Sequence, residues 1–175
     1  MSILFITFVS VTTARGFLIS LYIVGDSFDP SSGNPMSIWK KTISTQVLAD
    51  IHHKTAVELL GIEFLEVGDD FIKARVPVDE RTRQPYGILH GGVSVVLAET
   101  LGSCGAAFSV EEGYRAVGLD INANHIKATT HGWVTGIARP VHRGRTTHVW
   151  QIDLTNDAGE LTCVSRITMA VLAPR

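Results

Sequence analysis

The chain lacks any large excess of charge of one sign. Its 175 residues include 15 lysines and arginines and 17 aspartates and glutamates, which gives a net charge of −2. Without a basic field over the surface we expect no nucleic acid partner, and an anionic ligand needs a local cluster of basic side chains. Apolar residues make up 45% of the chain, which is typical of a globular protein and not of a disordered one.

Cysteine is scarce, and no histidine pattern is typical of a metal site. Cys104 and Cys163 lie in apolar stretches without the spacing of metal ligands. We expect both to be buried free thiols, which fits a reducing, cytoplasmic setting. His52 and His53 are adjacent and point in different directions on a helix, so they are poor joint ligands. We therefore expect no metal and no other cofactor.

The motif Gly-x-Ser-x-Gly of many serine hydrolases is also absent. Ser94 and Ser103 are present, but neither stands in that strand-to-helix turn sequence, so serine hydrolase chemistry is disfavoured.

Neither apolar run near the N-terminus reaches the length of a membrane span. The runs at residues 3–9 and 17–24 are both too short, and residues 29–35 have the composition of a linker. Met36 then opens a stretch typical of the start of a soluble protein. We expect residues 1–35 to be an upstream extension, non-native or disordered, and residues 36–175 to be the folded domain without a membrane partner. A membrane anchor in the extension is the alternative.

The pattern after Met36 begins with a helix and a pair of strands. Ser44 or Thr45 can cap a first helix that ends at Gly61. Strands are expected over residues 62–67 and 71–78, because a turn sequence separates two apolar runs.

The rest of the sequence, from residue 92 onward, predicts one long helix and then four strands. Residues 92–108 are apolar nearly all round, so we expect a helix that is buried on most sides. The strands are expected over residues 116–123, 125–141, 146–155 and 161–172, paired as an antiparallel meander, with Gly132 or Gly136 bending the second. The simplest packing is an α+β fold in which one antiparallel sheet wraps around the long central helix.

Glu99 stands in the middle of the apolar helix. A buried carboxylate is costly unless it is paired, protonated or functional. A structural glutamate, bonded to a strand or across a subunit contact, is the alternative. We favour a catalytic base or nucleophile.

Glycines open the same helix, in the sequence Gln84-Pro-Tyr-Gly-Ile-Leu-His90-Gly91-Gly92. Backbone N–H groups that no side chain covers can hold an oxyanion there, with support from the helix dipole. A tight turn is the alternative reading of the glycines. His90 is either a helix cap or a residue that orients substrate, and Ser103 shares the helix face of Glu99.

A basic turn lies between the second and third of the last four strands, in the sequence His142-Arg-Gly-Arg-Thr-Thr147. An exposed hairpin tip is the ordinary interpretation. As a functional site, Arg143 and Arg145 can grip a phosphate where Gly144 allows a close approach. Lys127, with His125 nearby, could add to that grip.

These residues carry a resemblance to a known family. The stretch from Gln84 to Ser103 closely resembles the hot-dog-fold acyl-CoA thioesterases, and the similarity runs from about Met36 to the C-terminus. It includes residues 120–125 and 149–152. Within the family it is greatest to the bacterial enzymes that hydrolyse 1,4-dihydroxy-2-naphthoyl-CoA in menaquinone biosynthesis.

The resemblance implies homodimers, usually assembled as dimers of dimers, with active sites at the dimer interface. It implies that Glu99 is the nucleophile or general base and that Gly91 polarises the thioester carbonyl. Gln84, His90 and Ser103 match residues that position substrate and water. The stretches that contact the substrate and its CoA portion match Gly118, His125, Ile126, Lys127, Ala128, His142, Arg143, Gly144, Arg145, Thr146 and Thr147. Lys127 stands where the resemblance leads us to expect arginine. Lysine keeps the positive charge but lacks the planar guanidinium that can donate two hydrogen bonds side by side.

We therefore expect a thioesterase that hydrolyses an aromatic acyl-CoA to the free acid and CoA. A hydratase or dehydratase of the same fold is one alternative, but the His-Phe-Pro-type loop or paired Asp/His of those families is not found in the sequence. Broad-specificity aryl- or acyl-CoA thioesterases, carrier-protein thioesterases and non-catalytic acyl-CoA-binding proteins are the others.

Overall fold

The structure is a computed structural model that describes residues 9–12, 18–21 and 37–174. The chain divides into two compact units, Met1–Pro35 and Met36–Arg175. In the first unit, β1 (Val9–Thr12) and β2 (Leu18–Leu21) form a two-stranded antiparallel sheet. Most of residues 1–35 lie outside the described residues, so the expectation of an upstream extension stays a prediction.

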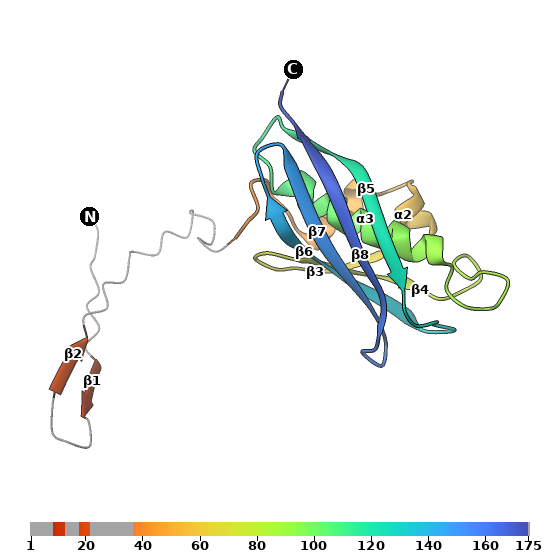
Figure 1. The fold of residues 1–175 in the computed structure, drawn as a ribbon, viewed down its shortest axis with the longest axis horizontal. Coiled ribbons are helices and arrows are strands. Elements are labelled where there is room, and N and C mark those ends of the chain that lie inside the picture. The colour runs from red at the N-terminus through yellow and green to blue at the C-terminus, as the bar shows by residue number, and fades with distance from the viewer. Residues whose placement is uncertain (1–8, 13–17, 22–36, 175) are drawn as a thin grey trace. The chain divides into compact units, whose positions relative to one another are not determined.

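The second unit contains one six-stranded antiparallel sheet and the long helix α3 (Gly91–Phe108), which lies against the sheet (Figure 1). The strand order is β3-β4-β6-β7-β8-β5. The strands are β3 (Glu63–Val67), β4 (Ile72–Pro77), β5 (Arg115–His125), β6 (Trp133–Arg143), β7 (Thr147–Asn156) and β8 (Leu161–Leu172). This arrangement confirms the predicted α+β fold of an antiparallel sheet around a central helix.

Small residues let α3 pack closely on the sheet. A Cβ on Gly105 would stand 2.6 Å from the ring of Trp150 in β7, so only glycine allows this contact. Leu97 and Leu101 are fully buried on the same side, and Leu101 packs against Gly136 of β6. The helix has the length and hydropathy of a membrane span, a property that it shares with core helices of this kind.

The predicted first helix is wrong as a single element. Ser44 does cap α1 (Thr45–Ile51), because its side chain accepts a hydrogen bond from the N–H of Val47. That helix stops after Ile51, and a separate short helix, α2 (Ala56–Leu59), begins at its own cap, Thr55. The turn between them places Lys54 at a φ of 57°, which breaks a continuous helix.

The predicted meander is wrong at its first strand. β5 pairs with β8 at one edge of the sheet and β6 pairs with β4, so β5 and β6 are not neighbours. The strand predicted over residues 125–141 begins only at Trp133, because residues 126–132 form a connection that crosses the end of the sheet from β5 to β6. Gly132, with a φ of 75°, ends the connection and leads into β6, whereas Gly136 lies inside that strand. The connection passes the start of α3, where the N–H of Leu89 donates to the carbonyl of Thr129.

Candidate functional site

His90 caps the long helix. Its backbone is extended, with φ −66° and ψ 130°, and its Nδ1 accepts a hydrogen bond of 2.9 Å from the N–H of Gly92. An imidazole that accepts at Nδ1 carries its proton on Nε2. Of the two readings that the sequence left open for His90, the structure shows the helix cap.

This cap leaves one backbone donor free at the start of α3. The N–H of Gly92 is occupied by His90, and the N–H groups of Val93 and Ser94 donate to the His90 carbonyl. Among the residues that the structure describes, none accepts from the N–H of Gly91. Because the positive end of the helix dipole lies here, Gly91 offers an anion or a polarised carbonyl a single directed donor.

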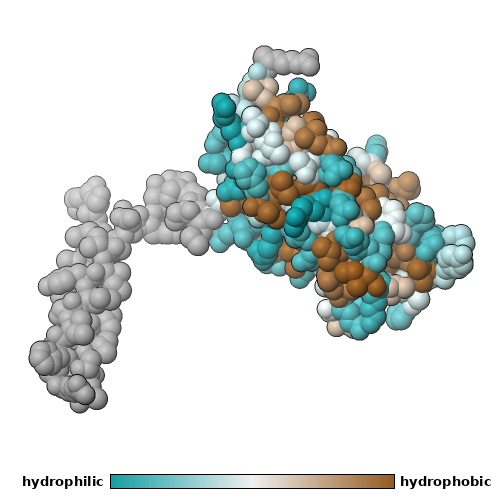
Figure 2. Space-filling view, in the orientation of Figure 1, coloured by the Kyte–Doolittle hydropathy of each residue, from teal (hydrophilic) through white to brown (hydrophobic). Residues whose placement is uncertain are grey.

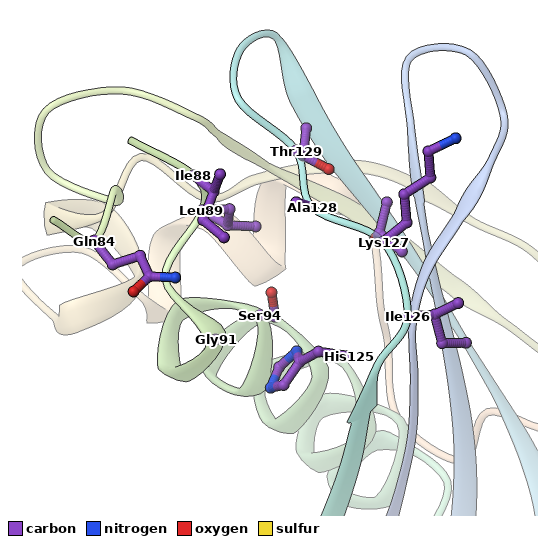
Figure 3. Close-up of a pocket in the computed structure, with 11 residues that line it drawn as sticks. Gln84, Ile88, Leu89, Gly91, Ser94, His125, Ile126, Lys127, Ala128 and Thr129 are labelled. Atoms are coloured by element: carbon purple, nitrogen blue, oxygen red, sulfur yellow. The ribbon is translucent and has the colours of Figure 1, made fainter. Parts of the chain in front are cut away.

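A cavity of about 240 Å³ opens beside this donor, and we call it the helix-start cavity (Figure 3). Several residues predicted from the sequence line it together, although they come from three separate segments. They are Gln84, Gly91, His125, Ile126, Lys127 and Ala128.

Gln84 reaches the cavity from a tight turn. Its N–H donates to the carbonyl of Ile88, and its carbonyl accepts from the N–H of Gly87. Gly87 has a φ of 76°, the left-handed conformation that glycine tolerates best. With Pro85 inside the turn, the sequence itself favours this short loop, which holds Gln84 at the cavity edge (Figure 3).

His125 is the last residue of β5 and points toward the start of α3 (Figure 3). The connection that follows it is held to β8, because the N–H groups of Ile126 and Lys127 both donate to the carbonyl of Thr162. Within the described residues, neither ring nitrogen of His125 has a hydrogen-bond partner.

Glu99 does not lie in the helix-start cavity. It lines a second cavity of about 290 Å³, the Glu99 cavity, together with Ser103, Val95, Val96 and others. The shared cavity matches the helix face predicted for Glu99 and Ser103. Glu99 is eight residues beyond Gly91, or about 12 Å along the helix axis. One chain therefore does not bring these two candidates into one cavity.

The prediction that Glu99 is buried is wrong for the single chain, where its side chain is exposed. The sequence of α3 is apolar nearly all round, but the sheet covers only part of the helix, and Val95 and Val96 stay half-buried beside Glu99. The Glu99 Oε1 lies 3.6 Å from the Cβ position of Gly118, which belongs to the edge strand β5.

The basic turn lines a third cavity of about 350 Å³, where Arg143, Gly144 and Arg145 lie near Ser109, just beyond the C-terminal end of α3. His142 and Thr146 are exposed beside it, and the carbonyl of Thr147 accepts from the N–H of Gly144. We call it the basic-turn cavity.

Lys127 does not join the basic turn within one chain. It lines the helix-start cavity, at the other end of α3, and its Nζ lies 2.5 Å from a carboxylate oxygen of Glu160. The suggestion that Lys127 adds to the basic turn is therefore wrong for a single chain.

His148 directly follows the basic turn but differs from the residues of that turn. It is 3% exposed, and the loss of water around it, with a smaller contribution from Arg143, lowers the pKa of its imidazole. It therefore stays neutral at neutral pH, and the positive charge that lines this cavity comes from Lys40, Arg143 and Arg145. Lys40 is paired with Glu111, so the two arginines are the cations available to an anionic ligand.

Sequence reasoning missed three hydroxyl residues of the helix-start cavity, which are Ser94, Thr129 and Thr162. Ser94 lies three residues after Gly91, and this helical spacing could have revealed it. Thr129 gave no such signal, because it falls in the connection that was predicted as strand. In the described part of the chain, no group of three His, Cys, Asp or Glu side chains is placed to hold a metal ion.

Comparisons with known proteins agree with this geometry. Residues 86–163 match the family model described as the thioesterase superfamily. The chain is 44% identical over 135 residues to the 1,4-dihydroxy-2-naphthoyl-CoA hydrolase of Escherichia coli, which covers 77% of this chain and 99% of that protein. It is 42% identical to a proofreading thioesterase of Cronobacter turicensis, with 77% and 98% covered. The crystal structure of a Haemophilus influenzae thioesterase has a TM-score of 0.76 and 49% identity, and the match covers 78% of this chain and 95% of that chain.

Proposed function

Since the chain belongs to the thioesterase superfamily of hot-dog-fold proteins and is a thioester hydrolase, we propose that it hydrolyses an aromatic acyl-CoA to the free acid and CoA. The first candidate substrate is 1,4-dihydroxy-2-naphthoyl-CoA, because the relative that is 44% identical carries this activity in its name. That substrate would give the protein a role in menaquinone biosynthesis.

The observation that carries the mechanism is the free N–H of Gly91 beside a cavity. A thioester oxygen that accepts from this N–H makes its carbonyl carbon more electrophilic. The Glu99 carboxylate then attacks that carbon, or removes a proton from a water that attacks it. In both routes the C–S bond breaks and CoA leaves as the thiol after protonation. Direct attack leaves a mixed anhydride between the acyl group and Glu99, which a water then hydrolyses to the acid and the free carboxylate, whereas attack by water gives the acid at once.

The separation of the two residues supports a site that is shared between two chains. Gly91 and Glu99 line different cavities in one chain, so a glutamate that reaches a carbonyl held at Gly91 is best supplied by a second copy. β5 is an edge strand that pairs with β8 on one side only, and it carries exposed apolar residues, Val117 at 43% and Leu119 at 64%. We propose a homodimer formed at this edge, which assembles further into a dimer of dimers.

The surface is consistent with such an interface. Apolar side chains gather between polar ones on the face of the second unit that β5, β7 and β8 present in Figure 2. Proteins commonly protect or cover an edge strand, because its free N–H and C=O groups otherwise pair with other chains.

The basic-turn cavity suits the phosphates of CoA. Arg143 and Arg145 are charge-assisted donors, and Gly144 leaves room for an approach to the backbone. α3 has 18 residues, and its two ends are about 27 Å apart. In this proposal the arginines of one chain therefore serve a thioester that is held at Gly91 of the other.

Two solved structures of a Staphylococcus aureus protein, 38% and 37% identical to this chain, add support for Gln84 and Glu99. One is a glutamate-to-alanine variant and the other a glutamine-to-alanine variant, and the protein is titled a thioesterase enzyme. The two substituted positions are separated by the same number of residues as Gln84 and Glu99.

A thiol-release assay with naphthoyl-, benzoyl- and fatty acyl-CoA esters tests the proposal. Wild-type protein is expected to prefer the aromatic esters, and Glu99→Gln is expected to lower kcat by at least about a hundredfold. Glu112→Gln removes an exposed carboxylate that lines none of the three cavities, so it is expected to leave turnover unchanged. A folded Glu99→Gln protein with wild-type turnover would refute the mechanism.

A thioesterase of broad specificity is the second candidate. It is favoured by the 42% identity to the proofreading thioesterase, whose name states no single substrate. It predicts similar kcat/KM values for aromatic and aliphatic esters, and turnover of acyl groups carried on a carrier protein. A preference for one aromatic ester over all others would exclude it.

A further inference from the structure

Apart from the chain neighbours of Gly91, the imidazole of His125 is the side chain closest to its Cβ position. The three heavy atoms closest to the Cβ position of Gly91 all belong to this ring, and Nε2 is the closest at 2.9 Å. Ser94 and Gln84 also line the helix-start cavity, but neither has an atom among those three. The polar edge of His125 therefore lies beside Gly91, in the cavity that both residues line.

The ring is held in place from the backbone while its own polar atoms stay unused. His125 pairs with Cys163 across the β5–β8 ladder, and the two residues after it are bonded to Thr162. Neither ring nitrogen has a hydrogen-bond partner among the described residues. His125 is exposed in the single chain, so both nitrogens are open to a ligand in the helix-start cavity.

An oxyanion is usually stabilised by more than one donor, and the backbone here offers only the N–H of Gly91. We propose that His125 is a catalytic residue whose Nε2–H donates the second hydrogen bond to the thioester oxygen. This inference rests on the proposed thioester hydrolysis and goes beyond a general contact with substrate. The charge on that oxygen grows as the tetrahedral intermediate forms, so the bond strengthens toward the transition state and acts on kcat more than on KM.

The first test compares three substitutions in the wild-type chain. His125→Phe keeps a planar ring but removes the donor, and it is expected to lower kcat for benzoyl-CoA by about a hundredfold while KM changes little. His125→Gln retains an N–H donor and is expected to recover part of that loss. His131→Phe is the matched control, because His131 is exposed on the same connection and lines none of the three cavities. Unchanged kcat in His125→Phe would overturn the proposal.

The second test observes the bond directly. Benzoyl-CoA with a ¹³C-labelled carbonyl is bound to Glu99→Gln protein, and its carbonyl stretch is measured by difference infrared spectroscopy. The carbonyl stretch is expected at lower frequency than in solution. In the double variant Glu99→Gln/His125→Phe it should move back toward the solution value. A stretch that does not respond to His125→Phe contradicts the inference.

The two tests also separate this inference from the function that it rests on. Wild-type protein that releases no thiol from any aryl-CoA would refute the proposed function, whatever His125 does. Wild-type protein that turns over, combined with His125→Phe that turns over equally well, would refute the role of His125 alone. Circular dichroism of each variant establishes that it is folded.

Discussion

The Nε2 atom of His125 lies 2.9 Å from the point that a Cβ on Gly91 would occupy. Real Cβ atoms essentially never approach a neighbour this closely, so any larger residue at position 91 must displace the imidazole. Glycine at this position therefore leaves the N–H uncovered and also keeps His125 beside it. Glycine is therefore required at position 91 because of the His125 side chain in β5, and not because of the geometry of the helix.

Gly91→Ala tests this relationship by a double-mutant cycle. The added methyl leaves the backbone N–H in place but displaces the imidazole, so kcat/KM should fall by about a hundredfold or more. In a His125→Ala background the collision is gone, and the same change should have a much smaller effect. Steady-state kinetics of the four proteins measures the coupling. Equal losses in both backgrounds would show that the methyl obstructs the substrate instead.

A site shared between two chains predicts that two inactive variants restore each other. Glu99→Gln and Gly91→Ala chains are mixed at equal amounts by joint unfolding and refolding. Random pairing then makes about one quarter of all sites free of both changes, so about a quarter of wild-type activity should return. Each variant refolded alone is the control. No recovery in a mixture whose mixed dimers are detected by mass spectrometry would place both residues in one chain.

Glu160 competes with any phosphate for Lys127. The two side chains are 2.5 Å apart and about half-exposed, and Lys127 followed by Asn156 lowers the pKa of the Glu160 carboxyl. The carboxylate thus stays charged and paired at neutral pH. If Lys127 binds the CoA portion, Glu160→Gln frees it and should lower KM by about two- to fivefold at low salt. The effect should vanish in a Lys127→Met background, and an unchanged KM would remove Lys127 from the CoA site.

The fold was largely predictable because its signals are local. The apolar length of α3 and the turn before β4 lie within short stretches of sequence, and both were predicted correctly. The cap of α1 was narrowed to Ser44 or Thr45, and the structure shows Ser44. The sheet order was not predictable in the same way. Ile126 and Ala128 continue an alternating pattern through the connection, so the residues resemble one strand. Only the long-range pairing of β5 with β8 shows that the chain must leave the sheet there.

The candidate site shows the same division between local and long-range information. The sequence grouped Gly91 with Glu99 because both belong to one helix, yet the structure separates them into two cavities. It also could not show that Glu99 is exposed, since apolar neighbours such as Val95 are equally expected on a face that another chain covers. His125 beside Gly91 is a contact across 34 positions, which no local pattern reveals.

Burial of Cys104 predicts a loss of stability in alkali. Burial raises the pKa of this thiol from its ordinary value of 9.0 to about 12. A group whose folded pKa is raised contributes its full stability below pH 9 and loses it as the pH rises toward 12. Between pH 8 and pH 10.5 the wild type should therefore lose about 2 kcal/mol more unfolding free energy than Cys104→Ala. Urea unfolding at both pH values measures the difference, and parallel losses in the two proteins would contradict it.

Gly105→Ala sets two effects of opposite sign against each other. Alanine improves helix propensity by about 1 kcal/mol. A Cβ at position 105, however, would stand 2.6 Å from the indole ring of Trp150, which is fully buried and stacks on Trp39 with a centroid distance of 6.3 Å. A ring confined in this way has little room to move, and overpacking costs about 1–3 kcal/mol, so we expect a net loss of stability.

Trp150→Phe provides the background that separates these two effects. The atoms that meet the new methyl belong to the six-membered part of the indole, and phenylalanine does not extend as far. In that background Gly105→Ala should be neutral or stabilising, because the propensity gain remains while the collision is relieved. Thermal unfolding of the four proteins measures the cycle. A stabilised Gly105→Ala single variant would mean that the sheet yields to α3, and that glycine is not required for the close packing of the helix on β7.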